Sequence, residues 1–190
     1  IKLVNVTIPQ GITTLEDNLF NGCYSLSAVE IPNGVSRIGY RSFYRCSSLK
    51  SLNIPDEVTH IDSGAFSDCS SLSQVFIPDS VISISRNVFY QCNRLIIYGN
   101  DGSYVMEYAK ANGIPFIDIN EMKKYDDFEY KLLNDSTIEI VRYVGNALNV
   151  VVPHGINGYS VVKIGERAFS LNTLRSITIP ESVNYISPDA

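Results

Sequence analysis

The dipeptide Ile-Pro recurs at a constant interval, and this interval constrains the fold more than any other feature. It stands at residues 8–9, 31–32, 54–55 and 77–78, which defines a 23-residue repeat. The same interval aligns a phenylalanine, a cysteine and a leucine in each unit, in the columns Phe20, Phe43, Phe66 and Phe89; Cys23, Cys46, Cys69 and Cys92; Leu26, Leu49, Leu72 and Leu95. A period of this length predicts a solenoid of stacked coils.

A single 23-residue unit is too small to fold alone. Its about seven apolar side chains gain roughly 1.5–3 kcal/mol each on burial. Ordering the backbone costs roughly 1–2 kcal/mol per residue. Stacking must supply the missing burial and hydrogen bonds. The predicted fold is therefore an α/β solenoid, a right-handed coil with a parallel sheet on one face.

Each coil begins with a short strand. In the unit from residue 26 to 48, Val29 and Ile31 are expected to point inward while Ala28 and Glu30 point outward. Pro32 then ends the strand, because proline cannot donate to a sheet ladder. A second inward pair follows on a short extended or helical segment, Val35 and Ile38. The phenylalanine column is expected to fill the wide end of the coil.

The four cysteines allow a disulfide, a zinc site or buried free thiols. Neighbouring cysteines in one column have parallel Cα–Cβ vectors, which keep their Cβ atoms too far apart for a good disulfide. No Cys-x-x-Cys pair or nearby histidine completes a tetrahedral zinc site. We therefore predict buried free thiols that act as small apolar fillers.

The period is lost after Leu95. Residues 98–103 are expected to form a turn, and Ser103 is a candidate N-cap for a helix that stops at Asn112-Gly113. Such a helix would cover the open end of the stack, as the caps of solenoids do. Residues 114–117 would then return as one more strand.

A second array is predicted beyond a polar, unpatterned junction at residues 120–127. Alternating apolar residues predict a β-hairpin over 128–143. From Val150 onward the apolar columns return with a longer, 27-residue period, and Asn172 stands near the missing cysteine column. The predicted domains are 1–119, a first array with a helical cap, and 120–190, a hairpin cap and the start of a truncated second array.

Composition excludes two classes of partner. The net charge is −5 and the pI is about 5.0, and no cluster of basic residues suits nucleic acid. No apolar run approaches the roughly 20 residues that cross a bilayer, so we expect no membrane insertion in this segment. Because both ends fall inside a repeat, we interpret the sequence as part of a longer protein.

The repeat unit resembles the BspA-like class of leucine-rich repeats. The shared elements are a strand ending in Ile-Pro, a V-x-x-I segment, an A-F-x-x-C turn and the leucine before the next strand, over residues 3–95 and 150–186. The helix region and the hairpin resemble segments that close and open such arrays. The resemblance implies a bacterial cell-surface or secreted protein that binds host or microbial macromolecules. The altered unit around Asn172 departs from the pattern.

The sequence offers no catalytic constellation. Its two histidines, His60 and His154, are far apart in the chain, and His60 is expected on the solvated surface. No nucleotide-binding, metalloprotease or serine-hydrolase motif occurs. The oxygen-rich Asn100-Asp101-Gly102 lacks the later ligands of a calcium loop and is expected to be a turn. We predict no catalytic residue, no metal site and no cofactor.

The outward face of the predicted sheet is the best candidate for binding. Two columns of mostly small and polar side chains line it: Asn5, Ala28, Ser51 and Gln74; Thr7, Glu30, Asn53 and Phe76. Phe76 is the aromatic exception. It either anchors a partner or is covered by the segment that ends the array. The second segment of each coil offers another polar face, and the sequence does not choose between the two.

The predicted function is therefore a non-enzymatic module that binds a protein or glycan ligand, in adhesion or host interaction. The candidate ligand-binding residues are Ala28, Glu30, Ser51, Asn53, Gln74 and Phe76. The alternative is a structural spacer that presents another domain of a larger surface protein.

Overall fold

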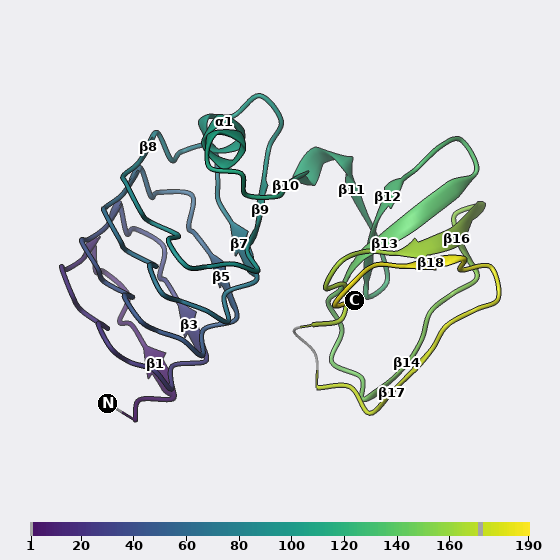
Figure 1. The fold of residues 1–190 in the computed structure, drawn as a ribbon, viewed down its shortest axis with the longest axis horizontal. Coiled ribbons are helices and arrows are strands. Elements are labelled where there is room, and N and C mark those ends of the chain that lie inside the picture. Colours follow the sequence, from purple (N-terminus) through teal and green to yellow (C-terminus); the bar gives the residue numbers. More distant parts are fainter. Residues whose placement is uncertain (1, 171–172) are drawn as a thin grey trace. The chain divides into compact units, whose positions relative to one another are not determined.

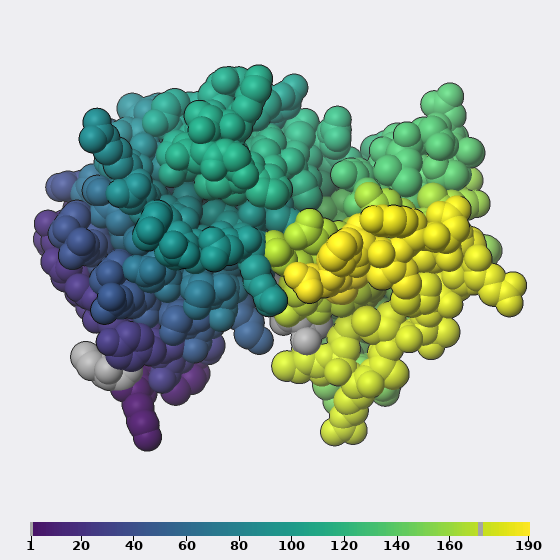
Figure 2. Space-filling model, in the orientation of Figure 1, coloured from purple at the N-terminus to yellow at the C-terminus, as the bar shows by residue number. Residues whose placement is uncertain are grey.

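The structure of the chain is a computed structural model that describes residues 2–170 and 173–190. Its residue contacts divide it into unit 1, Ile1–Ile119, and unit 2, Asn120–Ala190. Figure 2 colours unit 1 from purple to teal and unit 2 from green to yellow. Each unit has its own apolar core. The altered repeat at Asn172 lies outside the described residues.

Unit 1 is a β-solenoid of the predicted kind. Its coils lie one above another (Figure 1), and the first strand of each coil lies on one face: β1 (Asn5–Thr7), β3 (Ala28–Glu30), β5 (Ser51–Asn53), β7 (Gln74–Phe76), β9 (Ile96–Gly99) and β10 (Phe116–Asp118). A second parallel sheet joins β2 (Thr14–Leu15), β4 (Arg37–Ile38), β6 (His60–Ile61) and β8 (Ser83–Ile84). The second segment of each coil is therefore extended. Each residue in it pairs with the residue 23 positions further along the chain, so Ile38 lies opposite Ile61 and Ile61 opposite Ile84.

Like residues stack on like residues inside the coils. The rings of Phe43 and Phe20 have centroids 5.2 Å apart, and those of Phe43 and Phe66 are also 5.2 Å apart. Phe89 continues the row at 5.6 Å. The leucine column is buried beside it. The predicted interior row of phenylalanines is confirmed.

The cysteine column does more than fill space. All four cysteines are free and buried, as predicted. Three of the thiols also donate a hydrogen bond to the backbone carbonyl of the phenylalanine in the preceding coil: Cys46 to Phe20 at 3.3 Å, Cys69 to Phe43 at 3.1 Å and Cys92 to Phe66 at 3.2 Å. Cysteine suits this column because it combines a small apolar side chain with a weak donor.

The helix at the end of the stack is formed as predicted, but the residues before it differ from the prediction. Helix α1 (Tyr104–Ala111) begins at Ser103, whose side chain accepts from the Met106 amide, and ends at Asn112. Its apolar side chains Val105 and Ala109 are buried in the core of unit 1. The expected turn after Leu95 is wrong for its first residues. Residues 96–99 form β9, which pairs with β7 after a step one residue shorter than the repeat.

A short 3₁₀ helix, η1 (Ile119–Glu121), spans the boundary between the units, and the first strand of unit 2 is β11 (Met122–Tyr125). This strand corrects the expectation of an unpatterned junction, because it pairs antiparallel with β12 (Phe128–Leu132). The predicted hairpin is formed by β12 and β13 (Thr137–Tyr143). Strand β13 also pairs with the long strand β16 (Tyr159–Ile164), so the hairpin extends the sheet of the second array.

The second array keeps its predicted longer period. Strands β14 (Asn149–Val151) and β17 (Ser176–Thr178) pair in parallel, with Val150 opposite Ile177. The extra residues form a tight turn between β15 (Gly155–Ile156) and β16. Asn157 and Gly158 have positive φ there, as this kind of hairpin turn requires. The last strand, β18 (Tyr185–Ile186), pairs with β16.

Candidate binding site

The first strands of the coils bring the predicted columns into line. Asn5 lies opposite Ala28 and Thr7 opposite Glu30 in the pairing of β1 with β3. Ser51 lies opposite Gln74 and Asn53 opposite Phe76 in the pairing of β5 with β7, the same register further along the stack. Within each of these strand pairs, the residues of the predicted columns therefore lie side by side.

This face is not one continuous sheet. Strands β1 and β3 form a pair, whereas β5, β7, β9 and β10 form a separate sheet, so β3 and β5 do not pair with each other. The predicted parallel sheet on this face is therefore divided into two parts. Where a ladder is interrupted, the facing backbone N–H and C=O groups of the two strands can bond to another molecule.

A hollow of about 370 Å³ lies at the break between β3 and β5. Four of the six predicted ligand-binding residues line it: Ala28, Glu30, Ser51 and Asn53. Glu30 and Asn53 are exposed, Ser51 is half-buried, and Ala28 adds no bulk. The hollow therefore offers one negative charge, an amide and a hydroxyl beside unpaired strand edges. This combination can donate and accept hydrogen bonds but supplies no nucleophile with an adjacent base.

Gln74 does not belong to the hollow and is a correction to the predicted site. It occupies the outward column, but its side chain is fully buried. Its neighbour on the far side is Ile96 of β9, the strand that the sequence analysis missed. The side-chain nitrogen and oxygen of Gln74 have no hydrogen-bond partner among the described residues.

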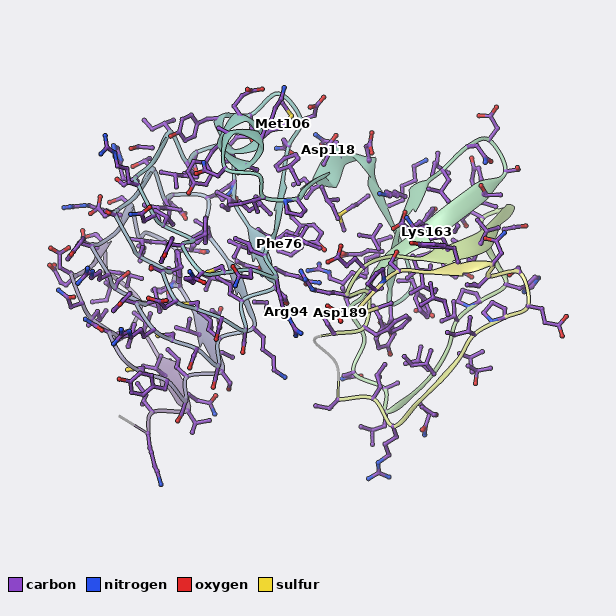
Figure 3. The ribbon with its side chains drawn as sticks, viewed as in Figure 1. Phe76, Arg94, Met106, Asp118, Lys163 and Asp189 are labelled. Carbon is purple, nitrogen blue, oxygen red and sulfur yellow. The ribbon has the colours of Figure 1, made fainter. Side chains whose placement is uncertain are left out.

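Phe76 is half-buried and does not stand alone. Its ring stacks on that of Tyr98 in β9, with centroids 4.5 Å apart and planes inclined by 17°. Figure 3 shows Phe76 on the sheet face of unit 1. The segment that ends the array thus partly covers Phe76. The signal for this pair was the apolar run of residues 96–98, which continues the strand pattern at a shortened step.

The buried thiols are not a reactive site. Burial raises the pKa of Cys46 and of Cys92 to about 12, and it raises the pKa of Cys69 well above its ordinary value of 9.0. The reacting species of cysteine is the thiolate. These residues are therefore unreactive at neutral pH and serve the packing of the coils.

Other candidate chemistry is not brought together by the fold. Within residues 2–170 and 173–190, no group of three or more His, Cys, Asp or Glu side chains could hold a metal ion. His60 is exposed, with its Nδ1 2.8 Å from the hydroxyl of Thr59. In the same described residues, no helix combines the length and apolar character that crossing a bilayer requires.

The fold and the hollow define a class of protein: a parallel β-solenoid with a polar, shallowly hollowed sheet face. The chain belongs to the BspA-type leucine-rich repeat family. The family described as "BspA type Leucine rich repeat region" matches it in six copies, over residues 1–107 and 152–190. The resemblance drawn from the repeat columns is confirmed. The curated proteins contain no match to the chain.

Several solved bacterial leucine-rich repeat proteins are similar to this chain. One from Eubacterium ventriosum is 19% identical, with 97% of this chain and 50% of that chain covered and a TM-score of 0.41. A leucine rich cell surface protein from Faecalibacterium prausnitzii is 23% identical, with 97% and 56% covered and a TM-score of 0.33. The T. pallidum leucine-rich repeat protein is 19% identical, with 93% of this chain and 74% of that chain covered and a TM-score of 0.44. This chain therefore spans about half of the first two structures.

Proposed function

We propose that the chain is a non-enzymatic binding module of a bacterial cell-surface or secreted protein. It recognises a protein or glycan ligand through the hollow between β3 and β5, in adhesion or host interaction. The observation that carries the proposal is the gathering of Ala28, Glu30, Ser51 and Asn53 around one hollow at a break in the sheet. Membership of the family supports the place on the cell surface.

The mechanism is recognition by a rigid scaffold. The side chains of the hollow stand on strands whose inward residues are packed in the core of unit 1, so little order is lost when a ligand binds. Backbone groups of β3 and β5 that do not pair across the break would add hydrogen bonds to the ligand. The exposed Glu30 and Asn53 would select among ligands.

Binding of the purified chain to immobilised extracellular-matrix proteins and to epithelial cells tests the proposal. We expect Glu30→Arg to weaken binding at least tenfold and Asn53→Ala to weaken it several-fold. A matched control is Glu107→Arg, which reverses an exposed charge on α1 outside the hollow. It should bind as the unaltered chain does.

The structural spacer is the outcome that would replace this proposal. A spacer predicts that none of the matrix proteins or cells bind the chain, or that binding survives Glu30→Arg and Asn53→Ala unchanged. Phe76→Ala separates the hollow from the rest of the face. Because Phe76 stacks on Tyr98 and does not line the hollow, its loss should weaken binding less than Glu30→Arg does.

A further inference from the structure

In each of the four 23-residue coils of unit 1, two backbone positions in the left-handed region flank the stacked phenylalanine. They lie two residues before and two residues after the stacked phenylalanine, in the columns Asn18, Arg41, Gly64 and Asn87; Gly22, Arg45, Asp68 and Gln91. Their φ angles lie between 53° and 73°. Glycine adopts this conformation readily, and asparagine and aspartate tolerate it. The second coil differs, because arginine occupies both of its positions.

The two arginines are unfavourable choices for the backbone. Arg41 has a φ of 53° and Arg45 a φ of 60°. A left-handed residue other than glycine costs roughly 1–2 kcal/mol. Within the described part of the chain, no carboxylate forms an ion pair with either guanidinium. No salt bridge therefore offsets this cost, and strained residues of this kind gather at functional sites.

Aromatic rings hold these guanidinium groups in place. The guanidinium carbon of Arg41 lies 5.0 Å from the ring centre of Tyr40 and 4.9 Å from that of Tyr44. The guanidinium of Arg45 lies 5.0 Å from the centre of the same Tyr44 ring. Stacking occupies the face of a guanidinium and leaves its N–H edge free, and this edge matches the two oxygens of a carboxylate.

A second hollow, of about 230 Å³, opens beside Arg41 across three coils. Tyr40, Arg41 and Tyr44 line it from the second coil, Asp68 from the third, and Asn87 and Tyr90 from the fourth. Gly64 also lies in this lining, next to the aliphatic part of the Arg41 side chain. Tyr90 is 56% exposed and Tyr40 is 38% exposed.

We propose that this hollow binds one sugar residue that carries a carboxylate, at the end or along the chain of an acidic glycan. Arg41 pairs with the carboxylate, and the exposed tyrosine rings pack against the C–H groups of the sugar ring. Asp68 and Asn87 bond to the sugar hydroxyls, which can donate to one and exchange hydrogen bonds with the other. The site is separate from the hollow between β3 and β5, with which it shares no lining residue.

Size and charge favour a sugar over an acidic peptide. The volume lies below the roughly 300–1,000 Å³ of ordinary small-molecule pockets, so the hollow suits a single ring. Asp68 would repel the successive carboxylates of an acidic peptide, whereas a sugar with one carboxylate can face both Arg41 and Asp68. Arg45 stands outside the lining and cannot provide a second pairing partner inside the hollow.

The test uses oligosaccharides that end in a uronic or a sialic acid, each with its methyl ester as the neutral partner, and a set of Asp- and Glu-rich peptides. We expect at least one acidic oligosaccharide to bind the 190-residue chain at least tenfold more tightly than its ester. Arg41→Gly should remove at least a factor of ten of this affinity. Tyr90→Ala should also weaken binding, because its exposed ring lines the hollow.

The matched control is Arg45→Gly. It removes the same charge and relieves the same backbone strain, but the residue does not line the hollow. It should keep the affinity within about threefold, and both glycine variants should melt no lower than the unaltered chain, since glycine suits a positive φ. If Arg41→Gly and Arg45→Gly lost the same affinity, the binding would result from non-specific attraction to positive charge, and the proposal would be wrong. The proposal is also overturned if no acidic oligosaccharide binds, if the esters bind as well, or if only the peptides bind.

Discussion

Unit 1 and unit 2 bury their aromatic side chains in different ways. In unit 1, rings from equivalent positions of successive coils stack at 5.2–5.6 Å. In unit 2, Tyr143 packs between Phe128 and Phe169, which come from a hairpin strand and from a repeat turn. The first arrangement follows from repetition alone. The second depends on which strand pairs with which.

The two units also differ in whether charged side chains are buried. Among the described residues of unit 1, no charged side chain is buried. In unit 2, Glu139 of β13 is only 6% exposed, and its carboxylate lies 3.5 Å from Lys131 and 3.2 Å from Lys163 of β16. A buried carboxylate needs such partners, since an unpaired charge is costly away from water. The coils of unit 1 thus stack around an apolar core, whereas the sheet of unit 2 encloses a carboxylate that is paired with two lysines.

Loss of a ring from the middle of the stack should have the largest effect. Phe43→Ala leaves a cavity between Phe20 and Phe66, and we expect it to lower the free energy of unfolding of unit 1 by about 3–5 kcal/mol. Phe20→Ala, at the end of the row and 8% exposed, should cost clearly less. Hydrogen exchange of the amides in each unit measures the losses separately. Equal losses at the two positions would break the comparison, because they would show that stacking on both sides adds nothing.

Removal of the buried carboxylate should destabilise unit 2 by a smaller amount. Glu139→Ala leaves Lys131 and Lys163 without their shared partner. Both lysines are partly exposed and can turn toward water, so we expect a loss of about 1–3 kcal/mol. The control is Glu181→Ala, which removes an exposed carboxylate of unit 2 and should cost below about 1 kcal/mol. Urea unfolding measures both. Similar small losses would mean that unit 2 does not depend on the cluster.

The thiol hydrogen bonds should contribute the least. Cys69→Ala removes the donor to the Phe43 carbonyl, whereas Cys23→Ala removes a similarly buried thiol that has no carbonyl acceptor among the described residues. We expect Cys69→Ala to cost about 0.5–1.5 kcal/mol more than Cys23→Ala in urea unfolding. If the two variants lose the same stability, the cysteine column is filler only, as the sequence alone suggested.

The sequence predicts unit 1 well because its period places each residue type against copies of itself. The stacked phenylalanines, the buried cysteines and the helix that begins at Ser103 all follow from spacing and capping. Strand β9 was missed because its step is one residue shorter, although the run from Ile96 to Tyr98 signalled a strand. The burial of Gln74 was missed with it, since that burial depends on a neighbour that the expected turn would not provide.

The break in the sheet and the hollow beside Arg41 could not be predicted from the aligned columns of the repeat. The break between β3 and β5 leaves no mark in the columns, because both strands fit the repeat equally well. The hollow beside Arg41 needs three coils at once, so no single repeat reveals it. A signal did exist within unit 1, where the columns of Arg41 and Arg45 otherwise hold glycine, asparagine, aspartate or glutamine; in unit 2, Arg167 holds the equivalent position two residues before Phe169. Three of these four types favour the left-handed conformation, which makes an arginine there unusual.

Thiol labelling of the native chain tests the central claim most directly, namely that coils of one shape stack with like side chains in the interior. At pH 8 the thiolate fraction of a group with a pKa near 12, such as Cys46, is about a thousandfold lower than that of an ordinary cysteine, because each pKa unit is a factor of ten. The account predicts that an alkylating reagent modifies none of the four cysteines until denaturant is added. Rapid alkylation of Cys46 or Cys69 in the folded chain would contradict it.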